Sequence, residues 1–100
     1  MIDINKQIRM AVKTGKVDLG ANQTLEAARL GRAKLIVLAS NCPQAERTEI
    51  EYNSKLSQIP IFVYAGSSLD LGTVCERPHV VSAIAVKEQG DSEVLKLAVS

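Results

Sequence analysis

The sequence contains few of the residues on which metal and redox sites depend. It has no tryptophan, one histidine and two cysteines, and aromatic residues make up 3% of the chain. Cys42 and Cys75 lie far apart, and no Cys-x-x-Cys or cysteine–histidine ligand spacing is present. This excludes the common zinc sites, so we expect no metal and no cofactor. The cysteines are expected to be free thiols in the core, with a disulfide left open by the sequence alone.

Catalytic groups are equally scarce. A thiol nucleophile needs a base beside it, and the only histidine, His79, has no evident link to either cysteine. We therefore expect no catalytic residues and no enzyme activity. Two alternatives remain at this stage. One is a small thiol or redox enzyme, which rapid labelling of the native cysteines would support. The other is a protein-interaction module built on the acidic segment with Glu46, Glu49 and Glu51.

Long hydrophobic runs and an excess of one charge are also missing. No apolar run approaches the roughly 20 residues of a membrane span. The charged residues of the segment 1–6 are unlike a signal peptide. We expect a cytoplasmic protein without membrane contact. Twelve basic and eleven acidic residues give a formal net charge of +1. Any nucleic-acid binding should therefore depend on a small local patch and vary only modestly with salt.

Aliphatic residues are abundant, and their spacing predicts alternating helices and strands. Hydrophobic residues make up 46% of 100 residues, which suits one domain (1–100) with an ordinary core. The alternation predicts an α/β protein in which a four-stranded, mixed sheet lies between helical layers. The apolar run 35–39 predicts a central strand covered on both faces. Helices are expected from Asp3 to Gly15, from a cap at Asn22 to about Leu30, from Asn41 and Pro43 to about Ser57, from Ser67 to Val74 and over 93–99; strands are expected over 17–19, 35–39, 61–64 and 81–87.

The turn Gly20-Ala21-Asn22-Gln23-Thr24 is the strongest functional signal in the chain. It follows a short apolar run and opens an expected helix, so free backbone N–H groups lie beside an amide that both donates and accepts. Such a turn can bind phosphate oxygens and read the edge of a base. Asn22 has a competing structural role as a helix cap, which is the commoner use of asparagine at such a position.

A second segment, Arg77-Pro78-His79-Val80-Val81, has the composition of a partner loop. Its mixture of polar and apolar residues suits an unstacked nucleotide, on whose base His79 can stack. Structural roles remain open for both polar residues, since a lone histidine is often structural and Arg77 can cap a carbonyl or pair with Glu76. Four cations, Lys16, Arg29, Arg32 and Lys34, flank the first turn in the sequence. Each can reach a phosphate or simply be a solvated surface charge, and four around one loop favour binding. Together the two loops indicate a small RNA-binding protein.

Five motifs, in order and at the expected spacing, connect these signals to a known family. They are Leu19–Thr24, Gly31-x-Ala33 to Ala39-x-Asn41, Glu51-Tyr52, Leu69-x-Leu71-Gly72-Thr73 and Arg77-Pro78-His79-x-Val81-Ser82. The series resembles the thirty-e family of large-subunit ribosomal proteins in its archaeal form, over nearly the whole chain. That family belongs to the kink-turn RNA-binding superfamily that includes the ribosomal seven-Ae protein.

The resemblance implies a three-layer α/β/α sandwich that binds a kink-turn of ribosomal RNA in the cytoplasmic ribosome, beside other ribosomal proteins, and is a monomer elsewhere. The loop entering the second helix would meet sheared G·A pairs, and the loop before the fourth strand would hold an extruded nucleotide. The implied RNA-binding residues are Gly20, Ala21, Asn22, Gln23, Thr24, Lys34, Arg77, Pro78, His79 and Val81.

Three positions qualify the resemblance. Glu26 stands where family members often have lysine, and Glu76 replaces a frequent glycine. Asn22 matches the seven-Ae members, which also serve in guide-RNA particles. A kink-turn-binding subunit of a guide-RNA or RNA-processing particle is therefore the alternative to a ribosomal role.

Overall fold

The computed structural model describes residues 3–98. Its strands form one mixed sheet in the order β1-β4-β2-β3. β2 and β3 are parallel, whereas β4 is antiparallel to both of its neighbours, β1 and β2. The carboxyl ends of β1, β2 and β3 therefore share one edge of the sheet with the beginning of β4. The strands are β1 (Lys16–Leu19), β2 (Leu35–Ala39), β3 (Ile61–Tyr64) and β4 (Ala83–Glu88).

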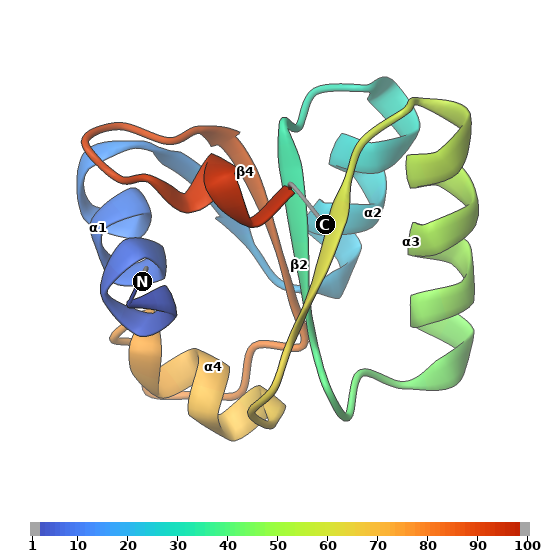
Figure 1. Ribbon diagram of the computed structural model, residues 1–100. Coiled ribbons are helices and arrows are strands. Elements are labelled where there is room, and N and C mark those ends of the chain that lie inside the picture. Colours follow the sequence, from blue (N-terminus) through green and yellow to red (C-terminus); the bar gives the residue numbers. More distant parts are fainter. Residues whose placement is uncertain (1–2, 99–100) are drawn as a thin grey trace.

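Helices cover both faces of the sheet (Figure 1). α2 and α3 lie on one face, and α1, α4 and the short 3-10 helix η1 lie on the other. This is the three-layer α/β/α arrangement with a four-stranded mixed sheet that the sequence predicts. The helices are α1 (Ile4–Thr14), α2 (Ala21–Leu30), α3 (Gln44–Leu56), α4 (Ser68–Val74) and η1 (Val94–Ala98). None of the helices within residues 3–98 is long and apolar enough to cross a bilayer.

β2 is the centre of the core, as its continuous apolar sequence predicts. All five of its residues are 0% exposed. Because successive strand residues point to opposite faces, Leu35 and Val37 join the cluster beneath α1 and α4, whereas Ile36 and Leu38 join the cluster beneath α2 and α3. Burial of each such aliphatic side chain contributes roughly 1.5–3 kcal/mol, so this strand anchors both helical layers.

Two predicted helix starts are confirmed in atomic detail. The Asp3 carboxylate accepts a hydrogen bond from the Lys6 N–H (3.2 Å), which caps α1. The Ser67 hydroxyl and the Asp70 carboxylate exchange hydrogen bonds with each other's backbone N–H, and this reciprocal pair begins α4. Each cap satisfies donors that the first helical turn leaves without an internal partner.

Two boundary expectations are wrong. The N-cap of α2 is Gly20, not Asn22. β4 begins at Ala83 rather than at residue 81. Gly15 ends α1 as expected, in an extended conformation (φ −108°). A glycine is needed there because a Cβ would collide with the carbonyl oxygen of Glu88.

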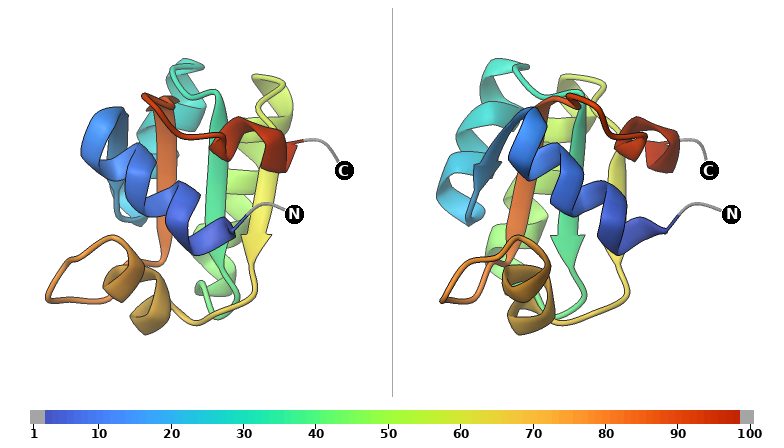
Figure 2. Two further views of the ribbon diagram at one scale, coloured as in Figure 1. Left: turned by 60° about the vertical axis from the view of Figure 1, so that its left-hand side comes forward. Right: turned by 90° about the vertical axis from the view of Figure 1, so that its left-hand side faces the viewer.

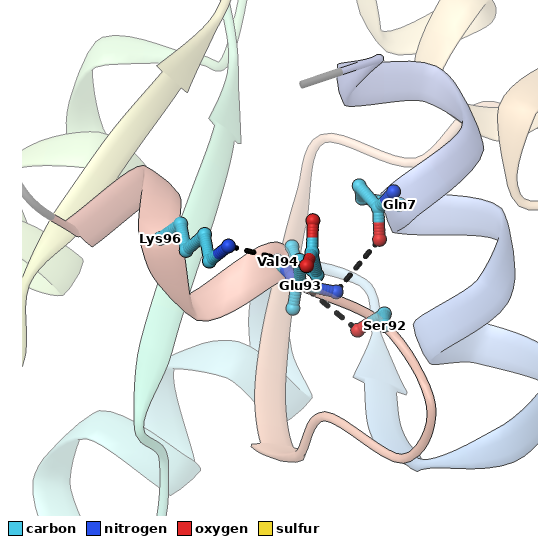
Figure 3. Close-up of polar contacts among 5 residues, drawn as sticks. All are labelled: Gln7, Ser92, Glu93, Val94 and Lys96. Atoms are coloured by element: carbon cyan, nitrogen blue, oxygen red, sulfur yellow. Dashed lines mark hydrogen bonds and ion pairs between the residues drawn. The ribbon is translucent and has the colours of Figure 1, made fainter. Parts of the chain in front are cut away.

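The segment after β4 returns to α1. The Gln7 side-chain oxygen accepts a hydrogen bond from the Glu93 N–H (2.6 Å), and Lys96 pairs with the Glu93 carboxylate (3.1 Å; Figure 3). These contacts hold η1 on the α1 side of the sheet, where Val94 is 0% exposed. The predicted final helix is therefore present as a 3-10 helix, and its expected end at Val99 lies outside the described residues.

Candidate RNA interface

The two loops selected from the sequence lie side by side at one end of the molecule. We call this the loop end: the β1–α2 turn and the loops that precede α3, α4 and β4. The Gly20 N–H donates to the Ala83 carbonyl (2.8 Å), which joins the β1–α2 turn to the start of β4. The α4–β4 loop, residues 75–82, leads directly into that strand. In Figure 1 the loops before α3, α4 and β4 are at the bottom and the β1–α2 turn lies above them; both views of Figure 2 show the β1–α2 turn and the α4–β4 loop on the same side.

The other loops at this end are joined to the same framework. The Ser40 N–H donates to the Gly66 carbonyl (3.0 Å), and the Asn41 side chain accepts a hydrogen bond from the Ser68 N–H (2.7 Å). Asn41, part of the family motif, thus connects the loop before α3 to the first turn of α4. These bonds fix the loops to one another as well as to the sheet.

The β1–α2 turn exposes backbone donors. The first helical hydrogen bond of α2 runs from the Thr24 N–H to the Gly20 carbonyl (3.0 Å), so the N–H groups of Ala21, Asn22 and Gln23 precede it. No side chain caps this helix. Gly20 has φ +109° and ψ 152°, a backbone region essentially restricted to glycine, and no atom lies within 4 Å of its missing Cβ. An approaching ligand therefore meets bare backbone.

The amide side chains of Asn22 and Gln23 are exposed beside these donors. Because Gly20 occupies the cap position, Asn22 does not cap the helix. Its side-chain amide is therefore available to hydrogen-bond a ligand. Gln23 lines a shallow groove along α2 and β1, together with Glu26, the Asp18–Lys87 ion pair (2.8 Å) and, at the far end, Arg32. The amides thus offer both donors and acceptors at the surface.

Thr24 and Val81, both predicted to bind RNA, are unavailable at the surface. Thr24 is 0% exposed, and its hydroxyl has no hydrogen-bond partner within the described part of the chain. Val81 is 2% exposed in the core, and its N–H donates to the Ser68 carbonyl (3.0 Å). The exposed aliphatic side chain of this loop is Val80 (57%), which the sequence reasoning missed. Two adjacent valines gave no signal to tell the buried one from the exposed one.

The rest of the α4–β4 loop faces outward. Arg77, Pro78 and His79 are exposed, and the loop is held by its contact with α4. The Arg77 N–H donates to the Gly72 carbonyl (2.9 Å), and a Cβ on Gly72 would overlap the carbonyl oxygen of His79. Gly72 thus lets the loop lie directly against the helix, which sets the position of the His79–Val80 backbone.

Charge is sparse at this loop. Glu76 has φ +59°, a conformation that favours glycine, and its carboxylate pairs with Lys13 (3.2 Å). This conformation agrees with the glycine that the resemblance implies at this position. Since Glu76 is engaged by Lys13, Arg77 makes no ion pair within residues 3–98. Arg77 is therefore a guanidinium that a phosphate can approach.

The four cations that flank the β1–α2 turn in sequence do not flank it in space. Lys34 lies at the start of β2, where its N–H donates to the Val86 carbonyl (2.8 Å). Lys16 begins β1, and Arg29 and Arg32 lie at the end of α2 and just beyond it. A ten-residue helix spans about 15 Å, so these residues are at the opposite end of the molecule. Lys34 therefore does not share a surface with the two loops, and its predicted phosphate contact stays a prediction.

The thiols have none of the features of reactive cysteines. Cys42 and Cys75 are 7% and 1% exposed and belong to core clusters on opposite faces of the sheet, so they do not form a disulfide. Burial raises the pKa of Cys42, and it raises the pKa of Cys75 to about 11. Both groups are therefore protonated near neutral pH, which argues against the thiol-enzyme alternative.

Comparison with known proteins identifies the family. The sequence profile of the ribosomal protein L7Ae/L30e/S12e/Gadd45 family matches residues 2–96. The chain is 52% identical over 95 residues to the large ribosomal subunit protein eL30 of Methanopyrus kandleri, covering 95% of this chain and 87% of that protein. It is 44% identical to eL30 of Methanothermobacter thermautotrophicus (96% and 98% covered) and 43% identical to eL30 of Pyrobaculum neutrophilum (97% and 96% covered). The chain therefore belongs to the ribosomal protein L7Ae/L30e/S12e/Gadd45 family.

Proposed function

We propose that this chain is a non-enzymatic structural component of the large ribosomal subunit in the cytoplasm, and that it binds a kink-turn of ribosomal RNA as a single domain. Relatives that match nearly the whole chain carry the name of one large-subunit protein, which supports the ribosomal role. The observation that carries the RNA-binding role is the adjacency of two exposed loops from distant parts of the sequence, joined through the Gly20–Ala83 hydrogen bond.

The two loops have complementary tasks in this proposal. The N–H groups of Ala21, Asn22 and Gln23 bind phosphate at the positive end of the α2 dipole. The Asn22 and Gln23 amides hydrogen-bond base edges of the kinked strand. Arg77 contacts a phosphate across the gap, while His79 and Val80 enclose the one displaced base.

The loop end suits recognition of RNA shape better than bulk attraction of RNA. Its donors are backbone groups fixed by the helix, and they lose little conformational entropy when a ligand binds. Glu26, one turn into α2, is a carboxylate where the resemblance implies a lysine. It therefore contributes no phosphate contact, and binding depends the more on the first turn of the helix.

The test is a titration of the full chain against a short kink-turn RNA and a control RNA in which the G·A pairs are replaced. We expect tight binding to the kink-turn and at least about tenfold weaker binding to the control, as for loss of specific base contacts. Equal affinity for the two RNAs would reject kink-turn recognition. Co-sedimentation with large subunits, rather than recovery with small guide RNAs, distinguishes the ribosomal role from the guide-RNA alternative. Gel filtration of the free chain tests the monomer.

A further inference from the structure

We infer that the turn between α2 and β2 is a second, separate contact surface for the phosphate backbone of double-stranded RNA. It consists of Arg29, Arg32 and Lys34, which we call the basic turn. This inference goes beyond the proposed function, because it assigns a second RNA segment to the end of the molecule opposite the loop end.

The three side chains of the basic turn are exposed and form no ion pair within residues 3–98. They lie within six consecutive residues that the backbone folds into a tight turn. The Arg32 N–H donates to the Ala27 carbonyl (2.9 Å), and Gly31 takes the left-handed conformation (φ 67°) that ends α2. The backbone therefore places all three residues at the C-terminal end of α2.

Neighbouring charges do not cancel the basic turn. Two acidic residues of the adjacent strands are already engaged: Asp18 by Lys87 (2.8 Å) and Glu88 by Lys16 (3.9 Å). Glu26 is the remaining carboxylate on α2; it stands three residues before Arg29 and lines the same groove as Arg32, but it forms no ion pair within residues 3–98. A chain of formal net charge +1 thus carries a local excess of three unpaired cations at one place.

The basic turn is far from the loop end. α2 separates them by about 15 Å along its axis, and Figure 1 shows the α2–β2 turn at the top of the molecule, with α4 and its loop at the bottom. A kinked strand seated on the N-terminus of α2 therefore leaves the basic turn accessible. In this proposal the RNA bound at the basic turn is a second segment, distinct from the strand at the loop end.

The composition of the basic turn favours phosphate over other anions. Two of its three cations are arginines, whose planar guanidinium groups bind phosphate oxygens in a bidentate manner. No exposed asparagine or glutamine stands within residues 29–34 to read bases. The expected binding is thus independent of sequence, weak and strongly dependent on salt.

The test uses the full chain and a blunt RNA duplex without a kink-turn. The variant Arg29→Gln/Arg32→Gln/Lys34→Gln should bind the duplex at least about tenfold more weakly than the wild type at low salt. The negative slope of log K against log salt should become shallower by about 2–3. A matched variant, Lys6→Gln/Arg9→Gln/Lys96→Gln, also loses three positive charges, from α1 and η1 on the other face of the sheet, and leaves the basic turn intact. It should bind the duplex within about twofold of wild type, as expected if net charge alone contributes little.

Three outcomes would overturn the inference. One is an equal loss of duplex binding in the two variants, which would indicate nonspecific attraction. Another is unchanged duplex binding in the basic-turn variant. The last is that the wild-type protein binds a polyglutamate of the same charge as tightly as it binds the RNA duplex, which would indicate an acidic protein partner instead of RNA.

A bridging assay separates this inference from the proposed function. Immobilised kink-turn RNA saturated with the protein should capture a labelled duplex, and the basic-turn variant should capture about tenfold less while it stays on the kink-turn RNA. Displacement of the protein by the duplex would place both RNAs on one surface and reject the second site. Direct duplex titration still tests the basic turn if the kink-turn RNA does not bind.

Discussion

The loop end and the basic turn offer an anion two kinds of positive potential. At the loop end the donors are backbone N–H groups of Ala21, Asn22 and Gln23, whose direction is set by α2, and Arg77 is the added cation. At the basic turn the positive charge is carried by three long, exposed side chains. Fixed dipoles select a ligand by its geometry, whereas mobile charges attract any polyanion and are screened by salt. This chain has almost no net charge, yet it has both kinds of positive potential, at opposite ends of α2.

The largest expected effect is that of Gly72→Ala. In an ordinary helix this change is stabilising by about 1 kcal/mol, because alanine is the better helix former. Here the new methyl group overlaps the carbonyl oxygen of His79. We expect a net loss of about 1–3 kcal/mol in the free energy of unfolding, together with weaker kink-turn binding, because the α4–β4 loop must move. Urea denaturation and an RNA titration measure the two effects.

The control for this substitution is Thr73→Ala, on the exposed side of the same helix. It should leave kink-turn affinity unchanged. Increased stability of Gly72→Ala with normal RNA binding would mean that the loop position does not matter to the loop end. Binding of a plain duplex at the basic turn should be unaffected by either change.

Asn22→Ala should separate binding from folding. The structure places Asn22 after the cap rather than at it, so its loss should leave the free energy of unfolding nearly unchanged, whereas removal of a true cap costs about 0.5–2 kcal/mol. Kink-turn binding should weaken by about 1–3 kcal/mol, as for loss of a good base contact. If urea denaturation shows a loss of stability while kink-turn affinity is unchanged, Asn22 stabilises the helix and does not contact the RNA.

Much of this architecture could be read from the sequence. The apolar run of β2, the Ser67–Asp70 capping pair and the glycines at the helix ends each depend on local chemistry, and they gave the elements and their order. The sequence could not show where each residue lies in space or whether its side chain faces the core or the solvent. Lys34 follows the β1–α2 turn closely in sequence, yet one helix carries it to the far end. Likewise, the choice between Val80 and Val81 depends on a core contact that adjacent residues cannot reveal.

A pair of glycine substitutions compares the two ends of α2 directly. Gly20→Ala and Gly31→Ala both force alanine into positive φ (109° and 67°), and neither new methyl group has an atom within 3.5 Å. We expect each to cost about 1–2 kcal/mol in the free energy of unfolding, from backbone strain alone. Only Gly20→Ala should also weaken kink-turn binding, because it reorients the N–H groups of the first turn. Equal losses of affinity would show that α2 stability, not local geometry, controls binding.

The smallest expected effects are those of single cation substitutions. They test whether one RNA contacts both the loop end and the basic turn. Arg77→Gln should lower kink-turn affinity to a similar extent for all kink-turn sequences and reduce the salt slope by about 1, as for loss of one phosphate contact. Lys34→Gln should leave both quantities unchanged when the RNA is too short to reach past the N-terminal half of α2. The two variants carry the same change in net charge, so any difference between them measures position alone. Matched salt titrations of the two variants on one short RNA provide that comparison. If Lys34→Gln lowers the slope as much as Arg77→Gln does, the RNA covers the length of α2, and the loop end and the basic turn form one continuous surface.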